Sequence, residues 1–288
     1  MTRPAPHRTV RQPGLPTLPR IAAVPVGTVP IDTLLMPGQT LLDALAALMT
    51  DGIDSACLTL SGGALHPFAF VIPALSPDGS QAAFYSAAVQ PPGHTALDTA
   101  AVTVGWRGDT PFFHCHALWT TADGARGCGH VLPGQTVIAA PIHASGAGIV
   151  GARFEVHPDA ETGFSLFTPR PTGTAPCPGA RPAVALRLAP NQDLIETLEH
   201  AARTAGFTRA RVHGGVASIN EARFLSGPPV TGFATELLVR RGMIESAPAL
   251  LSELDIAIVD LLGTVATGHL VPGDNPVLMT FEGVLERA

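Results

Sequence analysis

The sequence contains two related halves, and this internal repeat limits the possible folds more than any other feature. Residues 37–40 (PGQT) correspond to residues 190–193 (PNQD), and apolar residues at helical spacing follow each of them. Near the other end of each half, residues 129–134 (GHVLPG) correspond to residues 268–273 (GHLVPG). Correspondences that recur in the same order are most simply explained by two copies of one small unit.

Each half is predicted to combine one helix with several strands. In the first half Thr40 is a plausible N-cap, and an apolar stripe from Leu41 to Met49 predicts an amphipathic helix that ends near Gly52. Short apolar runs separated by glycine and proline then predict a mostly antiparallel sheet. The expected fold class is therefore α+β, with two copies of a small domain in which the sheet packs on a helix.

Composition shifts divide the chain into four segments. Residues 1–28 begin with a proline-rich stretch that carries several arginines, and they are expected to form a flexible basic arm. Residues 29–168 form the first predicted domain, and residues 183–288 form the second. Residues 169–182 are rich in proline and glycine, which disfavour helix and central strand, and are predicted to be a linker. The arm can contact phosphates or a partner subunit, or it is simply a solvated tail.

The composition favours a globular protein that does not depend on electrostatic attraction to nucleic acid. Of the 288 residues 46% are hydrophobic and 14% are charged, and the formal net charge is -6. A negative balance does not supply the general attraction that phosphate backbones require, although a local basic patch remains compatible with it. The four cysteines lack the spacing of a disulfide scaffold, and no apolar run is long enough to cross a bilayer. The sequence therefore predicts a cytoplasmic protein without a secretory signal.

Three histidines of the first half form the strongest chemical motif. His114 and His116 are two residues apart in a predicted strand, so their side chains point to the same face. His130 follows a glycine-rich turn that is long enough for the next strand to bring it alongside. Three imidazoles with an open fourth position are typical of a catalytic zinc site or a related divalent-metal site. The alternative is that the pair forms a polar face in contact with water and that His130 caps a turn.

The second half lacks this pair. The corresponding positions fall in residues 253–258 (ELDIAI), which contain no histidine, and only His269 remains. If the first half binds metal, the second is expected to be a degenerate copy that acts as a scaffold.

Several motifs resemble the plant and prokaryote conserved (PPC) domain family. They are residues 215–219 (GVASI), 234–238 (ATELL), 268–270 (GHL) and 277–285 (VLMTFEGVL). The first half resembles prokaryotic members at His114, His116 and Gly129-His130, so the resemblance implies that these three histidines are the metal ligands. It covers most of residues 36–168 and 183–288.

The resemblance also implies properties of the whole protein. Family members are small α+β domains that assemble as trimers, and prokaryotic members commonly carry a DNA-binding label. Two domains fused in one chain depart from that pattern, and three such chains would give a hexamer of domains. No Arg-Gly-Arg-Pro AT-hook core occurs, and the nearest stretch is residues 179–182 (GARP), so minor-groove reading by that device is not supported.

A metal site of this kind needs groups that move protons or hold an anionic substrate. The acid–base candidates are Glu155, Asp159 and Glu161, and the anion-binding candidates are Arg126 and Arg153. For each of these residues the alternative is a solvated surface side chain.

Two functions therefore follow from the sequence. The first is a divalent-metal-binding protein with a small-molecule pocket in the first domain, either a metal-dependent lyase or a hydrolase. The second is a DNA-binding transcriptional regulator. The sequence leaves open whether the protein is an enzyme, and it also leaves open an oligomeric protein without a site.

Overall fold

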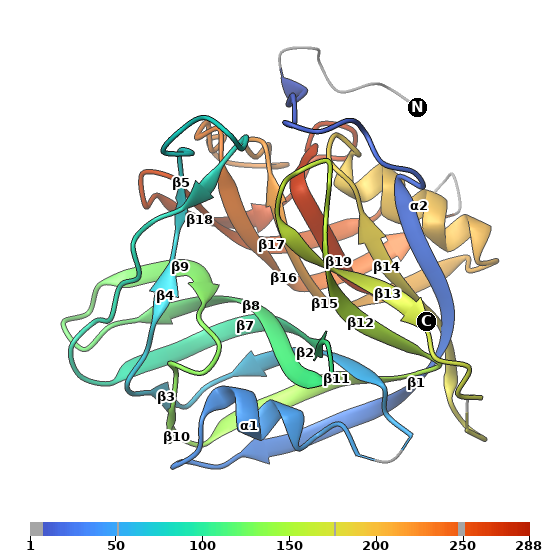
Figure 1. Cartoon of the computed structure of the whole chain (residues 1–288), viewed down its shortest axis with the longest axis horizontal. Helices are drawn as coiled ribbons and strands as arrows, with labels where there is room; N and C mark the ends of the chain where they lie inside the picture. Colours follow the sequence, from blue (N-terminus) through green and yellow to red (C-terminus); the bar gives the residue numbers. More distant parts are fainter. Residues whose placement is uncertain (1–7, 51, 176, 247–250) are drawn as a thin grey trace.

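The computed structural model describes residues 8–50, 52–175, 177–246 and 251–288, and these residues form mainly strands (Figure 1). The first half contains β1 (Ile21–Leu35), α1 (Leu41–Ala46), β2 (Ser55–Ser61), β3 (Ala64–Leu65), β4 (Phe70–Val71), β5 (Pro73–Ala74), β6 (Phe84–Tyr85), β7 (Thr95–Arg107), β8 (Thr110–Thr120), β9 (Arg126–Val131), β10 (Ile138–Ala140), β11 (Ile142–Val150), β12 (Ala152–Pro158) and β13 (Ser165–Pro171). The second half contains β14 (Arg181–Leu188), α2 (Leu194–Thr204), β15 (Arg209–Ile219), β16 (Thr235–Glu245), β17 (Glu253–Asp260), β18 (Val265–His269) and β19 (Val277–Arg287).

The predicted α+β class is wrong, because the described residues form one large curled sheet with little helix. Seventeen strands join in a single sheet, and β5 and β6 form a separate pair. Thr40 does cap α1 by accepting a hydrogen bond from the backbone N–H of Asp43, but the helix has only 6 residues and its C-cap is Ala47. In the rest of the chain, glycine and proline residues separate long segments in which apolar and polar residues alternate or all residues are apolar. Segments with these patterns pair as strands. The dominant packing is therefore between parts of the sheet.

The strands pair in the same order in the two halves. In the first half the order is β1, β11, β2, β7, β8 and β9. In the second half it is β14, β19, β15, β16, β17 and β18. All of these neighbours are antiparallel, and β1 also pairs with β14, so this strand connects the two halves into one sheet.

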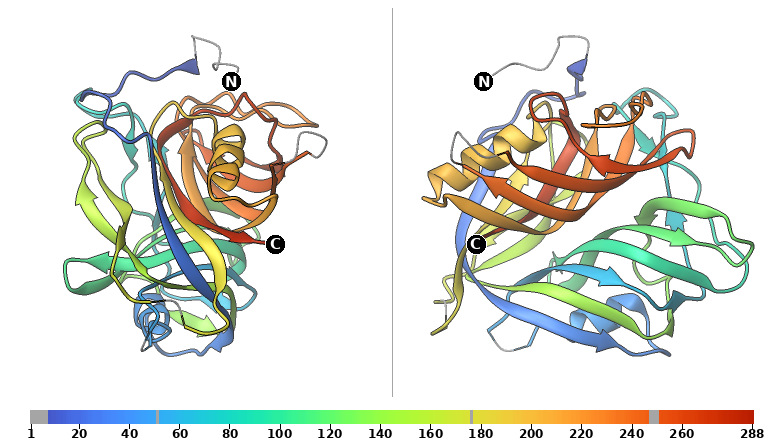
Figure 2. Two further views of the ribbon diagram at one scale, coloured as in Figure 1. Left: turned by 90° about the vertical axis from the view of Figure 1, so that its right-hand side faces the viewer. Right: turned by 180° about the vertical axis from the view of Figure 1, so that it is seen from behind.

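Each half has its own core, and three smaller apolar clusters combine residues of both halves. Helix α1 contributes Leu41, Ala44 and Leu45 to the core of the first half, and α2 contributes its buried face to the core of the second. Leu118 of β8 packs with Leu238 of β16 in one of the clusters shared by the two halves. The two parts of the sheet therefore face each other, as the rear view in Figure 2 shows.

Residues 21–28 of the predicted arm form the start of β1. The rest of the described arm, residues 8–20 (the N-terminal arm), lies against the second half. Arg8 is only 2% exposed, and it forms an ion pair with Asp274 and donates to the backbone carbonyl of Asn220 over 2.8 Å. Gln12 donates to the carbonyl of Leu278 over 2.6 Å. Residues 1–7 of the predicted arm lie outside the described residues. Because the guanidinium of Arg8 is already paired with Asp274, it is not free to bind phosphate groups.

The predicted linker contributes to an edge of the sheet. Its first residues belong to β13, which pairs with β12, and β14 begins at Arg181. Residue 176 lies outside the described part of the chain.

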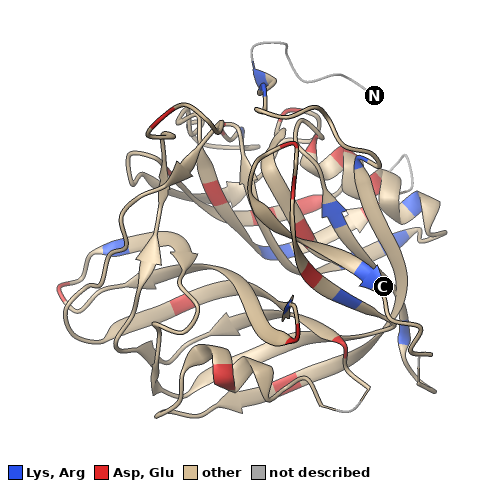
Figure 3. Cartoon of the chain, in the orientation of Figure 1, with Lys and Arg blue, Asp and Glu red and all other residues tan. Residues whose placement is uncertain are grey.

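Charged residues occur in both halves of the structure (Figure 3). No helix of the described residues has the length and apolar character needed to span a membrane.

Candidate metal centre

The three predicted histidines meet on the face of β8 and β9 that looks toward the second half. Phe113 and Cys115 point into the core of the first half, so His114 and His116 project from the opposite face of β8. His130 of β9 lies directly across the strand pair from His116. Strand alternation and antiparallel register together bring the three rings to one place.

Gly129 allows this register. A Cβ atom at this position would lie 2.6 Å from the backbone oxygen of Val71 and 3.4 Å from the Trp119 ring. Only glycine fits between these groups without displacing them, so the residue before His130 is set by close packing against β4 and β8.

The imidazole nitrogens converge on a common point. Nε2 of His114 and Nε2 of His116 are 3.1 Å apart. One nitrogen from each of the three rings lies within 4.8 Å of the others, and the ring centroids are 4.7 to 5.3 Å apart. His116 is buried, whereas His114 and His130 are half-buried.

The second half fixes the orientation of two of the rings. Nδ1 of His114 lies 2.5 Å from Oε1 of Glu282 on β19, and Nδ1 of His116 lies 2.7 Å from the backbone oxygen of Leu237 on β16. Both partners are acceptors, so each Nδ1 carries the proton, and Nε2 of each neutral ring keeps its lone pair. These Nε2 lone pairs are the donors that a metal ion requires.

Three features of the cluster suit a cation between the rings. Two Nε2 lone pairs at 3.1 Å repel each other unless a proton or a metal ion lies between them. Burial, and then repulsion from a protonated His114, lowers the pKa of His116 well below its usual value. Burial and repulsion from His114 and His116 lower the pKa of His130 in the same way, so protonation of these two rings is disfavoured. In addition, Nδ1 of His130 is buried and makes no hydrogen bond with any described residue. A divalent metal ion would satisfy all three nitrogens.

A second carboxylate from β16 borders the cluster. Oε2 of Glu236 lies 3.6 Å from Nε2 of His116, and this oxygen is buried and without a hydrogen bond among the described residues. Burial raises the pKa of Glu236 to about 8. The second half therefore supplies two acidic side chains to a site whose imidazoles come from the first half.

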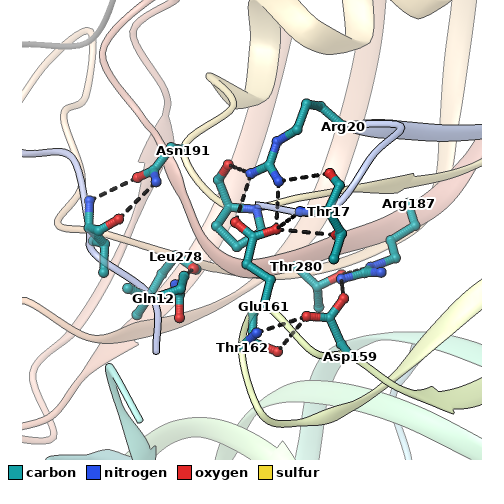
Figure 4. A network of polar contacts seen from close by, with 12 residues as sticks. Gln12, Thr17, Arg20, Asp159, Glu161, Thr162, Arg187, Asn191, Leu278 and Thr280 are labelled. Atoms are coloured by element: carbon teal, nitrogen blue, oxygen red, sulfur yellow. Dashed lines mark hydrogen bonds and ion pairs between the residues drawn. The ribbon is translucent and has the colours of Figure 1, made fainter. Parts of the chain in front are cut away.

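The predicted acid–base residues have other partners, and Figure 4 shows those of Asp159 and Glu161. Arg187 forms an ion pair of 2.6 Å with Asp159, and Arg20 binds both carboxylate oxygens of Glu161 at 2.5 and 3.0 Å. Nε2 of His157 lies 3.1 Å from Oε2 of Glu155. None of these three carboxylates contacts the histidine cluster, and their catalytic role stays a prediction.

The two predicted anion-binding arginines are also separate from the cluster. Arg126 is exposed at the start of β9 and lies 3.8 Å from Asp98. The guanidinium of Arg153 stacks 4.2 Å from the centroid of the Trp106 ring. No described contact joins either side chain to the imidazoles, so anion binding by them at this site also stays a prediction.

Sequence reasoning missed Glu236, Glu282 and Tyr85. A signal for the two glutamates was present, because each interrupts an otherwise apolar strand, in residues 234–239 (ATELLV) and 277–285 (VLMTFEGVL). A carboxylate in a fully buried strand requires a partner, and here the partners are histidines from the other half. No local pattern of this kind marks Tyr85, which lies in the two-residue strand β6. Its ring lies 5.2 Å from the ring of His130 because of the tertiary fold.

The fold and the site define a class of protein, a β-rich chain with a three-histidine centre between two halves of one sheet. Solved structures similar to it include a plant- and prokaryote-conserved (PPC) protein from Pyrococcus horikoshii, at 17% identity and a TM-score of 0.40, over 49% of this chain and 93% of that one. A metal-containing protein from Archaeoglobus fulgidus has 19% identity and a TM-score of 0.39, over 49% and 94% of the two chains. A protein from Ralstonia eutropha with a provisional DNA-binding name has 16% identity and a TM-score of 0.35, over 47% and 88%.

The PPC family, which the sequence motifs resemble, is thus represented among these similar structures. Comparison of the sequence with family models and with curated proteins gives no match.

Proposed function

We propose that this chain binds a divalent metal ion, zinc or another, through His114, His116 and His130, and that the adjoining cleft takes a small-molecule ligand. The observation that carries the proposal is the convergence of three imidazole nitrogens within 4.8 Å of one another. Random placement of three histidines on two strands does not orient their lone pairs toward one point.

The chain's own residues supply the environment for such an ion. Glu282 holds His114 in place by accepting its Nδ1 proton, and the carbonyl of Leu237 does the same for His116. Outer partners of this kind fix the tautomer and raise the basicity of the ligand nitrogen. Glu236 borders the same centre and is suited to accept or deliver a proton beside the ligand.

When bound, a divalent metal polarises a carbonyl group or lowers the pKa of its water. Three protein ligands leave a coordination position open, as in metal-dependent lyases and hydrolases. The finer proposal is that the protein is an enzyme of one of these two classes.

Metal content tests the proposal directly. Purified protein should contain about one divalent ion per chain by inductively coupled plasma mass spectrometry, whereas H116A and H130A should contain less than about a tenth of that amount. The matched control is H269A, because His269 occupies the corresponding position of the second half and is exposed. Absence of metal from all four proteins after incubation with zinc, cobalt or manganese salts would refute the proposal.

The remaining predictions concern partners. Self-association as a trimer is tested by light scattering on the full chain, which should give the mass of three chains. DNA binding by the basic arm is not favoured, because Arg8 and Arg20 are engaged in ion pairs with Asp274 and Glu161, and Arg11 is the one exposed arginine of residues 8–20. Binding to duplex DNA that is lost on removal of residues 1–20 would reverse this conclusion.

A further inference from the structure

The cleft beside the histidines is formed by both halves of the chain. Its lining includes His114, His116 and Glu236 and also three aromatic side chains, Phe84, Tyr85 and Phe164. The cleft is small and open to solvent, which limits a ligand to roughly the size of a single ring with a short substituent.

The aromatic wall is suited to a flat apolar group. The Tyr85 and Phe164 rings meet edge to face with centroids 5.9 Å apart, and the Phe84 ring lies 6.1 Å from Phe164. Met279 extends this wall from β19. Rings and a thioether arranged in this way favour contact with another planar apolar group.

The electrostatics of the cleft disfavour an anion. None of its described lining residues is an arginine or lysine, and Glu236 and Glu282 are the acidic groups nearest the imidazoles. The nearest arginine contact is Nε of Arg187, which donates to Oγ1 of Thr280 over 3.4 Å, but this guanidinium is paired with Asp159. Above the raised pKa of Glu236, two carboxylates offset the two positive charges of a divalent metal, so the loaded site then gains no net attraction for anions.

One polar atom of the cleft lacks a partner. Oε2 of Glu236, a residue only 5% exposed, makes no hydrogen bond with the described residues. An unpaired buried acceptor costs free energy, and a ligand N–H or O–H group would satisfy it.

We infer that the cleft binds a small uncharged molecule that places a planar apolar group against Tyr85 and Phe164 and donates an N–H or O–H group to Glu236. This inference rests on the small-molecule pocket of the proposed function and specifies its ligand class. It also replaces an anionic substrate as the expectation for this site.

Benzamide and benzoate provide a matched test, because they share shape and ring and differ in charge and in the donor group. Ligand-observed NMR titration of the purified full chain at about pH 9, where the Glu236 carboxyl is ionised, should give a dissociation constant in roughly the millimolar range for benzamide. Benzoate should bind at least about tenfold more weakly. Acetamide, which lacks the ring, should show no measurable binding.

Two variants separate the two contacts. E236Q should reduce or invert the preference for benzamide, because a glutamine amide can donate to the benzoate carboxylate. F164A should weaken benzamide binding about fivefold while the preference for benzamide over benzoate remains. E253Q is the control, since Glu253 is exposed on β17, and circular dichroism checks that each variant is folded.

The outcomes distinguish the two proposals when metal content is measured on the same samples. Preference for benzoate, absence of benzamide binding, or an unchanged preference in folded E236Q would overturn the ligand inference even if metal is present. Binding of benzamide with the expected preference in protein that never takes up metal would support the ligand inference and refute the metal proposal.

Discussion

Oε1 of Glu282 lies 2.5 Å from Nδ1 of His114, so a carboxylate of the second half holds an imidazole of the first. The two residues are 168 positions apart in the sequence. The second half is therefore more than a scaffold that has lost its own histidines, because it orients a ring of the candidate metal centre.

Replacing Glu282 should weaken metal binding without removing a ligand. E282A should lower metal affinity about 10- to 100-fold, because His114 loses the group that fixes its tautomer and orientation. E282Q should lose less, since the glutamine oxygen can still accept the Nδ1 proton. Competition with a chromogenic chelator gives the dissociation constants, and equal affinities in wild-type and E282A protein would show that the contact does not position the ligand.

Metal removal should lower the stability of the whole sheet. An ion present at about 100 times its dissociation constant, and bound only by the folded chain, adds about 2.7 kcal/mol to the free energy of unfolding. Chelation should therefore lower the melting temperature of wild-type protein and of H269A but leave that of H116A unchanged. A shift of the same size in H116A would mean that the ion binds somewhere else.

Gly129 should be more sensitive to substitution than the corresponding Gly268. G129A brings a methyl group to 2.6 Å from the Val71 backbone oxygen, so β9 must move, and His130 moves with it. We expect a loss of about 1 to 3 kcal/mol in unfolding free energy together with weaker metal binding. At Gly268 the nearest atom is 3.0 Å away in the Phe224 side chain, which can rotate, so G268A should keep the wild-type affinity for metal.

The N-terminal arm should stabilise the fold through Arg8. R8A removes the ion pair with Asp274 and leaves the carbonyl of Asn220 without its donor, so we expect a loss of about 2 kcal/mol. R11A is the control, because Arg11 is exposed on the same segment. Urea denaturation measures both, and equal stability of the two variants would contradict an anchoring role.

The Asp159 carboxylate should make stability depend on pH. Burial alone would raise the pKa of Asp159, but the N–H of Thr162 and the guanidinium of Arg187 outweigh it, and the pKa lies below its usual value of 3.8. A group with a lowered folded-state pKa stabilises the protein above its unfolded-state pKa, and this contribution disappears as the pH falls through the folded-state value. The difference in unfolding free energy between wild-type protein and D159N should therefore be largest near about pH 7 and shrink below about pH 4.

Urea denaturation at several pH values measures this difference. D109N, in which an exposed aspartate is replaced, is the control. A constant difference between wild-type protein and D159N across the pH range would contradict the role of the ion pair.

Local sequence patterns determined a specific part of this protein. Alternation along residues 112–116 (FFHCH) places both histidines on one face, and the glycine before His130 marks a position where no side chain fits. The apolar stripe after Thr40 also predicted α1, although the helix stops after 6 residues. These are short-range features, set by strand geometry, helical periodicity and sterics.

The tertiary structure alone decided the fold class and the environment of the imidazoles. The helical stripes suggested a sheet packed on helices, whereas the long strands curl so that β8 and β9 face β16, and the two halves cover each other. That packing brings Glu236 and Glu282 to histidines more than a hundred residues away, and it commits Asp159 and Glu161 to arginines instead. Sequence spacing carries no information about such partners, because they depend on how two distant segments of chain pack against each other.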